Sequence, residues 1–160
     1  MRTLLLVSAA LAASACAGCG QDNRCGPSSG TVARVIDGDT IELASGETIR
    51  YIGIDTPEST RGADDCYGEE SSDRNKELVE GRKVDITYDL ECTDRFDRLL
   101  GYIAIDGNEI NRQLVAEGFA CTLFIPPNGA ERQGEYQALE TQAQQQGTGL
   151  WGACEDVTCD

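Results

Sequence analysis

A run of short β-rich segments separated by turn signals constrains the fold of this chain most strongly. Residues 31–36 are rich in β-branched side chains and end at an Asp-Gly pair, which is typical of tight turns. Residues 40–44 follow and end at a Ser-Gly pair, and residues 48–54 form a third segment. Three strand patterns this close together predict a β-meander.

The rest of the chain predicts further strands and helices. Residues 69–80 form a polar pattern that stops at a glycine, which indicates a surface helix. Residues 84–88 alternate between apolar and polar side chains, and residues 99–105 are mostly apolar. These patterns predict a half-buried strand and a more buried strand. Residues 110–117 and 136–146 predict two more helices, each followed by a glycine.

The order of these elements indicates the fold class. Five strands with a helix between the third and the fourth is the order of an OB-type barrel. We therefore expect an α+β domain that is mainly β, a five-stranded OB-type barrel with about three helices. Another α+β arrangement of a curved sheet and helices is the alternative. With 160 residues, of which 40% are apolar, the chain is long enough for one domain with a real core.

The first residues are typical of an export signal. Arg2 supplies a positive start, and residues 4–13 form an apolar stretch that is too short to span a bilayer. We expect a signal peptide at residues 1–19, with Cys19 as a candidate lipidation site. The expected location is outside the cytoplasm, either secreted or attached to the cell envelope as a lipoprotein.

Three further boundaries complete the expected organisation. Residues 20–30 are rich in glycine, serine and polar side chains, which predicts a flexible tether. The folded domain is expected over residues 31–152. Residues 153–160 are expected to form a tail that contains cysteines.

The cysteine count predicts disulfide bonds. There are eight cysteines, and a signal that ends at Cys19 leaves an even set of six: Cys25, Cys66, Cys92, Cys121, Cys154 and Cys159. An even set in an exported chain indicates three disulfides. A zinc site is the alternative, but the six lack C-x2-C spacing and the chain has no histidine. Spacing suggests Cys66 with Cys92 and Cys121 with Cys154, although six cysteines allow fifteen pairings.

The charge and the absence of histidine limit the possible chemistry. The net charge is −15 and becomes −16 when the leader removes Arg2. Such a surface repels polyanions and offers no general basic patch. Without histidine, the commonest general base and metal ligand are both missing. Catalysis would therefore use carboxylates, arginines, hydroxyls or cysteines.

Two segments place carboxylates where they could act together. The sequence Asp-Gly-Asp-Thr that contains Asp39 is by itself only a tight turn. The segment after the third strand places Asp55 and Glu58 on either side of a Thr-Pro pair. Proline fixes its own φ and restricts the preceding residue, so the two carboxylates can be held rigidly in different roles. An exposed acidic loop is the alternative.

Two arginines occupy unusual positions. Arg50 lies inside an apolar strand, where an arginine is costly unless it is paired or faces a cleft. Arg98 immediately precedes the buried strand at residues 99–105. A surface ion pair with Asp94 or Asp97 is the alternative explanation for Arg98.

Taken together, the motifs resemble the staphylococcal nuclease (thermonuclease) family. The resemblance runs from about residue 32 to 151 and is carried by VARVIDGDTIEL, IRYIGIDTPE, YGEE, DRFDRLLGYI, EINRQLVAEGFA and the closing GLW. The combination of DGDT, then R-x4-DTPE, then D-x3-R is highly specific. The resemblance implies an OB-type barrel and a calcium-dependent endonuclease that acts on DNA and RNA and leaves 3′-phosphates.

The resemblance also implies a role for each residue of the site. Asp39 and Asp55 match calcium-binding carboxylates, and Thr56 matches the residue whose main-chain carbonyl binds the ion. Glu58 matches the general base that activates water. Arg50 and Arg98 match the arginines that hold the scissile phosphate.

The implied nucleotide pocket departs from the family pattern at two positions. Arg95 and Phe96 match a basic residue and an aromatic ring that contact the terminal phosphate and the base, and Phe124 falls near another aromatic residue of that pocket. Phe96 lacks a tyrosine hydroxyl. Asp97 replaces a common glycine and adds negative charge, so we expect reduced affinity rather than loss of chemistry.

The expected partner is nucleic acid, and the chain is expected to be a monomer. Because non-specific binding to duplex DNA depends on phosphate neutralisation, the acidic surface predicts a preference for single-stranded substrates. One alternative is a non-catalytic nucleic-acid or protein binding module of the cell envelope with the same fold. Another is a disulfide-linked envelope protein that binds calcium or sugar, but it leaves Arg50 and Arg98 without a role.

Overall fold

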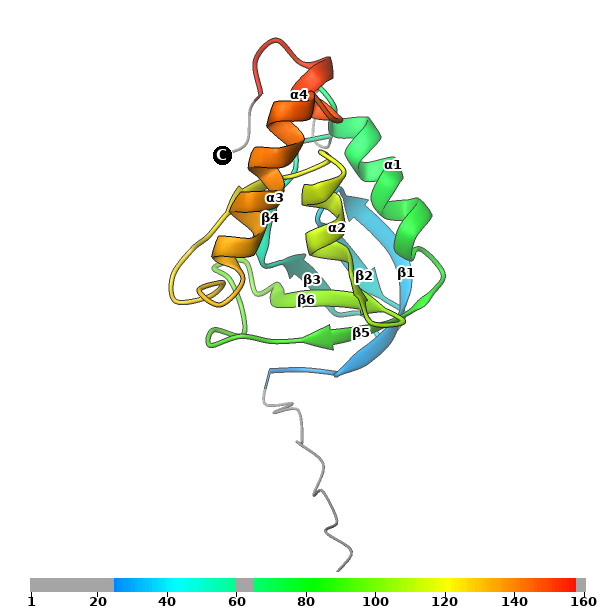
Figure 1. Ribbon diagram of the computed structural model, residues 1–160. Helices are drawn as coiled ribbons and strands as arrows, with labels where there is room; N and C mark the ends of the chain where they lie inside the picture. The colour runs from blue at the N-terminus through cyan, green and yellow to red at the C-terminus, as the bar shows by residue number, and fades with distance from the viewer. Residues whose placement is uncertain (1–24, 60–64, 158–160) are drawn as a thin grey trace, which may run out of the picture.

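The computed structural model describes residues 25–59 and 65–157, which form a closed five-stranded barrel with helices above it (Figure 1). The barrel strands are β1 (Ser29–Asp37), β2 (Thr40–Leu43), β3 (Thr48–Tyr51), β5 (Lys83–Thr87) and β6 (Leu99–Ile105). Antiparallel pairs join β3, β2, β1, β5 and β6 in that order. A parallel pairing of β3 with β6 closes the ring, which confirms the expected OB-type barrel.

The expected third strand is wrong in one respect, because it divides into two. β3 ends at Tyr51, and β4 (Gly53–Asp55) leaves the barrel to pair with β8 (Cys121–Leu123). Gly53 has a φ of 81°, a conformation that most side chains do not adopt. A Cβ at this position would also lie 2.9 Å from the Phe124 ring. Gly53 therefore turns the chain and directs Asp55 away from the barrel wall.

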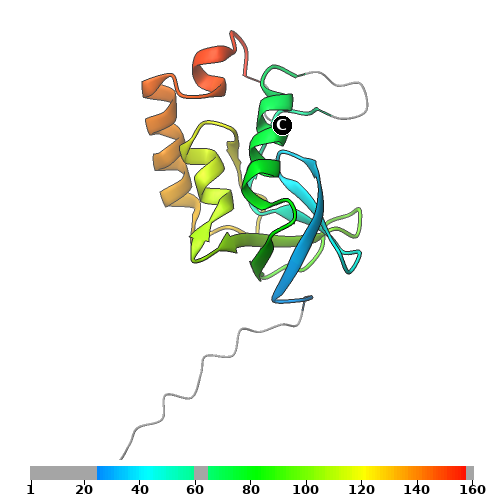
Figure 2. The same ribbon diagram turned by 90° about the vertical axis from the view of Figure 1, so that its right-hand side faces the viewer.

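Three expected helices are present, and a short fourth follows them. They are α1 (Gly68–Val79), α2 (Ile110–Ala116), α3 (Gln133–Gln146) and α4 (Leu150–Ala153). Figures 1 and 2 both show α2 between α1 and α3, over one end of the barrel. α3 ends at Gly147, whose φ of 60° is the left-handed cap expected at a helix C-terminus. Sequence patterns did not reveal α4, β8 or β7 (Asn108–Glu109).

The core is formed by the inward side chains of the barrel and the lower faces of the helices. The fully buried side chains include Ile41, Ile49, Ile86, Ile103 and Leu114. Burying a side chain of this size contributes about 1.5–3 kcal/mol to folding. This rigid barrel carries β2, β3 and β4, the strands that present the candidate site.

The disulfide pairing expected from spacing is wrong. The structure joins Cys25 to Cys92 and Cys66 to Cys154, and Cys121 is also disulfide-bonded. The partners are separated by 67 and 88 residues in the sequence. Only the fold brings such distant cysteines together. The predictions for Cys159 and Cys19 concern residues outside the described ranges.

The expected tether is partly wrong, because residues 25–30 belong to the folded domain. Cys25 is held by its disulfide, and the Tyr88 hydroxyl donates to the Pro27 carbonyl at 2.8 Å. Ser29 already pairs with Asp85 in the barrel. Cross-linking orders a segment whose composition alone favours flexibility. Within the described ranges, no helix is long and apolar enough to cross a membrane.

Candidate active site

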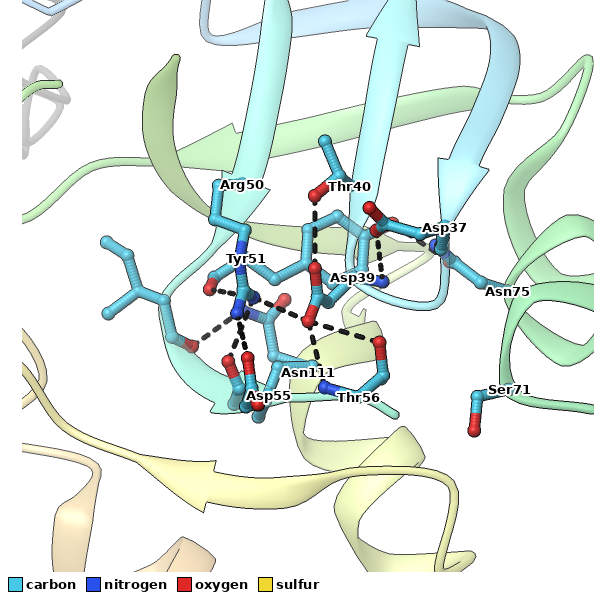
Figure 3. A network of polar contacts seen from close by, with 12 residues as sticks. Asp37, Asp39, Thr40, Arg50, Tyr51, Asp55, Thr56, Ser71, Asn75 and Asn111 are labelled. Atoms are coloured by element: carbon cyan, nitrogen blue, oxygen red, sulfur yellow. Dashed lines mark hydrogen bonds and ion pairs between the residues drawn. The ribbon is translucent and has the colours of Figure 1, made fainter. Parts of the chain in front are cut away.

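A tight turn between β1 and β2 carries Asp39 to the rim of the barrel. The Asp39 N–H donates to Asp37 Oδ1 at 3.1 Å, and the Asp39 carbonyl accepts from the Tyr51 N–H at 2.9 Å. A Cβ at Gly38 would lie 2.6 Å from Thr56 Oγ1. Glycine is therefore required for the turn to pack directly against Thr56, which follows β4 (Figure 3).

Arg50 joins the two predicted metal-binding carboxylates. Its Nη1 lies 2.7 Å from Asp39 Oδ2, and its Nη2 lies 2.5 Å from Asp55 Oδ1. Nη1 also donates to the Ile54 carbonyl at 2.9 Å. The side chains of Arg50, Asp39 and Asp55 are 14%, 5% and 17% exposed. The structure thus brings three of the expected site residues into one nearly buried cluster.

Further hydrogen bonds fix the Asp39 carboxylate. Its Oδ2 accepts from the Thr56 N–H at 2.9 Å and from the Thr56 hydroxyl at 3.2 Å, and its Oδ1 accepts from the Thr40 hydroxyl at 3.0 Å. Every oxygen of this buried carboxylate therefore has a partner, as buried charges require. The orientation of Asp39 is therefore set by β2, by β3 through Arg50 and by the segment that follows β4.

Burial and repulsion raise the pKa of Asp39 and of its neighbour Asp37. For Asp39, burial raises the pKa, Arg50 opposes the shift, and Asp55 adds to it. For Asp37, burial is the largest cause and Asp39 the next, and the pKa rises to about 6. Asp39 and Asp55 share one arginine, and Asp37 adds a third acidic group beside Asp39, so this region favours additional positive charge.

The donor types in this cluster fit a hard cation. Carboxylate oxygens of Asp39 and Asp55 converge on a common charge, and Thr56, whose N–H and hydroxyl donate to Asp39, follows Asp55 directly. Calcium prefers oxygen ligands of these kinds. Within the described residues, no group of three or more acidic, cysteine or histidine side chains forms a metal cluster. The candidate site therefore offers two carboxylates rather than a complete cage.

Glu58 lies at the exposed edge of the same region. It follows Pro57 after β4, and its N–H donates to Asp65 Oδ2 at 3.2 Å. The Asp65 N–H returns a hydrogen bond to the Glu58 carbonyl at 3.1 Å. A Cβ at Gly68 would lie 2.5 Å from that carbonyl oxygen, so the start of α1 packs closely on the main chain of Glu58.

The parallel pairing of β3 with β6 places Arg98 near the same rim. Arg50 is paired with Leu100, and paired residues of parallel strands point to the same face of a sheet. Arg98 precedes Leu100 by two residues, which corresponds to roughly 7 Å along the strand direction. The predicted ion pair is also present, because Arg98 Nε lies 2.7 Å from Asp94 Oδ2.

The predicted nucleotide-contacting residues fall in two different environments. The Phe96 ring is 63% exposed, with the Arg95 guanidinium 4.7 Å and the Arg98 guanidinium 5.5 Å from its centroid. Phe124 instead packs against the core, 5.9 Å from the Tyr136 ring. A role in nucleotide binding stays a prediction for Arg95, Phe96 and Phe124.

A buried hydrogen-bond chain that sequence analysis missed supports the Asp39 turn. The Tyr51 hydroxyl donates to Asn75 Oδ1 at 3.0 Å, and Asn75 Nδ2 donates to the Asp37 carbonyl at 3.1 Å. Asn75 is completely buried on the inner face of α1. A polar residue four positions before the buried Val79 was the available signal. α1 thereby holds the turn that presents Asp39.

An OB-type barrel with a carboxylate–arginine cluster at its rim is suited to binding a cation and an anionic ligand together. The family model described as "Staphylococcal nuclease homologue" matches residues 48–153. The chain therefore belongs to the staphylococcal nuclease family.

Individual relatives agree with this assignment. The chain is 33% identical to Endonuclease YncB of Bacillus subtilis (strain 168) over 80% of this chain and 64% of the relative. It is 34% identical to the SPbeta prophage-derived endonuclease YokF of the same organism, over 80% of this chain and 45% of the relative. It is 36% identical to a thermonuclease of Staphylococcus hyicus over 75% of this chain and 73% of the relative. The chain thus spans less than two thirds of the length of the first two relatives.

Proposed function

We propose that this protein is a calcium-dependent endonuclease that hydrolyses phosphodiester bonds of DNA, RNA or both. The observation that carries the proposal is the bridge that Arg50 forms between Asp39 and Asp55. The relatives named endonuclease and thermonuclease support the same reaction class. A non-catalytic binding module would not need this arrangement of acidic groups around an arginine.

The chain's own residues divide the chemistry between them. Glu58 is the proposed general base, because it is an exposed carboxylate beside the cluster in a chain without histidine. Arg50 and Arg98 are proposed to donate to the phosphate oxygens as negative charge builds in the transition state. A substrate phosphate must compete with Asp55 for Nη2 of Arg50. It meets no such competitor at the Nη atoms of Arg98 among the described residues.

Asp39, Asp55 and the Thr56 carbonyl are the proposed calcium ligands. When bound, calcium would supply Lewis-acid polarisation of the phosphate and would offset the repulsion between the acidic groups. Arg50 orients both carboxylates before any ligand binds, since its two Nη atoms contact one carboxylate each.

The setting and the substrate also remain proposals. We propose an exported monomer that is secreted or attached to the cell envelope through Cys19. The net charge of −15 favours single-stranded DNA or RNA that can enter the rim locally.

The reaction is tested with the purified protein, plasmid DNA and single-stranded DNA, in calcium or in chelator. We expect cleavage with calcium only. Glu58→Gln should lower kcat by about 100-fold or more without changing the melting temperature. Absence of calcium-dependent cleavage by the wild-type protein would refute the proposal.

Calcium binding is tested separately through stability. A ligand at 100 times its Kd stabilises the folded state by about 2.7 kcal/mol. Calcium should raise the melting temperature of the wild type and of Glu58→Gln, but not that of Asp39→Asn. An equal increase for Asp39→Asn would place the ion elsewhere.

A further inference from the structure

The Asp94 carboxylate accepts three hydrogen bonds inside the loop that precedes β6. Its Oδ1 accepts from the Phe96 N–H at 2.8 Å and from the Arg98 N–H at 3.0 Å, and its Oδ2 accepts from Arg98 Nε at 2.7 Å. The Asp94 side chain is 18% exposed and that of Arg98 is 30% exposed. One carboxylate therefore folds the loop with one oxygen and orients an arginine with the other.

The main chain around this contact is a short hairpin with a fixed base. The Asp94 N–H donates to the Arg98 carbonyl at 3.0 Å, and the Leu100 N–H donates to the Cys92 carbonyl at 2.9 Å. Cys92 is cross-linked to Cys25. The Asp94 carboxylate thus starts from a main-chain position that the barrel and a disulfide both hold.

The hydrogen bond from Arg98 Nε to Asp94 determines how the Arg98 guanidinium is oriented. A guanidinium is planar, so fixing the Nε–H direction fixes the plane of the whole group. Within the described residues, no protein group accepts from Nη1 or Nη2 of Arg98. Arg50 differs, because both of its Nη atoms already contact carboxylates. Arg98 therefore offers the bidentate edge that a phosphate requires.

We propose that Asp94 is a positioning residue that holds Arg98 through Nε so that its two Nη groups meet the substrate phosphate. The inference rests on the proposed nuclease function and deepens it. It also explains why a carboxylate is tolerated next to an anion-binding group. The negative charge of Asp94 is compensated by Arg98, whereas the side chain of Asp97 on the same loop has no hydrogen bond to Arg98.

Asp94→Asn separates orientation from loop folding. The amide oxygen can still accept from the Phe96 and Arg98 N–H groups, but the amide nitrogen would face Arg98 Nε, and two donors cannot bond. Misplacing a reacting group by about 1 Å costs on the order of 100-fold in rate. We expect kcat to fall by about 10- to 100-fold, with KM changed by less than about threefold and an unchanged melting temperature.

Asp97→Asn is the matched control. It removes the same charge from the same loop but leaves the Asp94–Arg98 contact intact. Because it only reduces repulsion of the substrate, we expect a lower KM and an unchanged kcat. A fall in kcat of equal size in Asp97→Asn and Asp94→Asn would overturn the proposal, since loop charge alone would then explain both.

A double-mutant cycle with Arg98→Met tests whether Asp94 acts through Arg98. Asp94→Asn should lower kcat in the wild-type background and change it by less than about twofold in the Arg98→Met background. The same reduction in both backgrounds would overturn the positioning role. An active wild type with an unaffected Asp94→Asn would refute this inference alone, whereas an inactive wild type would refute the proposed function.

A measurement that needs no turnover tests the role of Asp94 even if the wild-type protein is inactive. The Nε–H proton of Arg98 should give an NMR signal protected from solvent exchange, identified by its loss in Arg98→Met. Protection should disappear in Asp94→Asn and persist in Asp97→Asn. Retained protection in Asp94→Asn would show that Asp94 does not fix the guanidinium.

Discussion

The candidate site consists of two halves that are built differently. The buried half is the cluster of Asp39, Arg50 and Asp55, which come from the β1–β2 turn, from β3 and from β4, and each charged group in it contacts another. The exposed half is formed by Glu58, which follows β4, and by the loop that carries Arg98. The buried half holds its charges by contacts among nearly buried side chains, whereas the exposed half depends on hydrogen bonds within its own loops, on the more exposed Asp94–Arg98 pair and on cross-links. This difference predicts different responses to the same perturbation.

The sharpest test replaces one arginine in each half. Arg50→Met leaves Asp39 and Asp55 without their shared counter-charge, and breaking a buried pair costs about 3–5 kcal/mol. Arg98→Met breaks a partly exposed pair and should cost less than about 1 kcal/mol. Both should lower kcat by about 100- to 1,000-fold. Urea unfolding in chelator and initial rates in calcium measure the two effects.

The matched control for this pair is Arg34→Met. Arg34 is 59% exposed and pairs with Glu42 on the barrel surface, so both stability and rate should be nearly unchanged. Equal destabilisation by Arg50→Met and Arg98→Met would remove the distinction between the halves.

The next test concerns the disulfides, which both anchor the exposed half. Cys92 begins the loop of Arg98, and Cys66 lies between Glu58 and α1. Replacing Cys25 and Cys92 by serine should cost about 4 kcal/mol on the chain-entropy model. Below the melting temperature it should also lower kcat by about tenfold while the Kd for calcium changes by less than about twofold. A large loss of calcium affinity would mean that the two halves are coupled.

Acid pH should affect the halves in opposite directions. The pKa of Asp37 is raised to about 6 from 3.8, because of burial first and Asp39 next. The folded state then binds more protons than the unfolded state between these values, so stability rises as the pH falls through this window. The upper bound is about 3 kcal/mol. For Asp94, burial raises the pKa, but hydrogen bonds from Arg98 and the Phe96 N–H lower it overall.

The stabilisation by Asp94 is therefore present above pH 3.8 and is lost as the pH falls below that value. Urea unfolding in chelator across this range measures both effects. Asp37→Asn should reduce the rise between pH 3.8 and about 6 and leave the part that comes from the raised pKa of Asp39. A rise of unchanged size in Asp37→Asn would assign it to carboxyl groups other than Asp37.

Sequence patterns revealed the barrel because its strands carry strong local signals. Alternation at residues 84–88 and the apolar run at residues 99–105 matched β5 and β6 closely. Arg50 was also conspicuous, since a charge in an apolar strand needs a partner. The β4–β8 pair could not be seen, because each strand has three residues and their pairing joins distant segments.

Other features depended on three-dimensional proximity alone. Nothing local identifies Cys92 as the partner of Cys25, because the contact arises only when β1 is placed beside β5. The sequence offered Asp94 and Asp97 equally as partners of Arg98. Asp97 has a positive φ of 61°, and the turn that this conformation allows makes Asp94 the partner of Arg98.

The smallest expected effect is a response of activity to salt, and it concerns the surface around both halves. The net charge of −15 repels a polyanionic substrate beyond the site. Moderate salt screens this repulsion over roughly 10 Å at ~0.1 M, while the nearly buried contacts of Arg50 are screened much less. Initial rates on single-stranded DNA at fixed calcium should therefore rise about two- to threefold from very low salt to ~0.1 M before they fall. A steep, monotonic decrease from the lowest salt would mean that local attraction at the exposed arginines outweighs the repulsion by the rest of the surface.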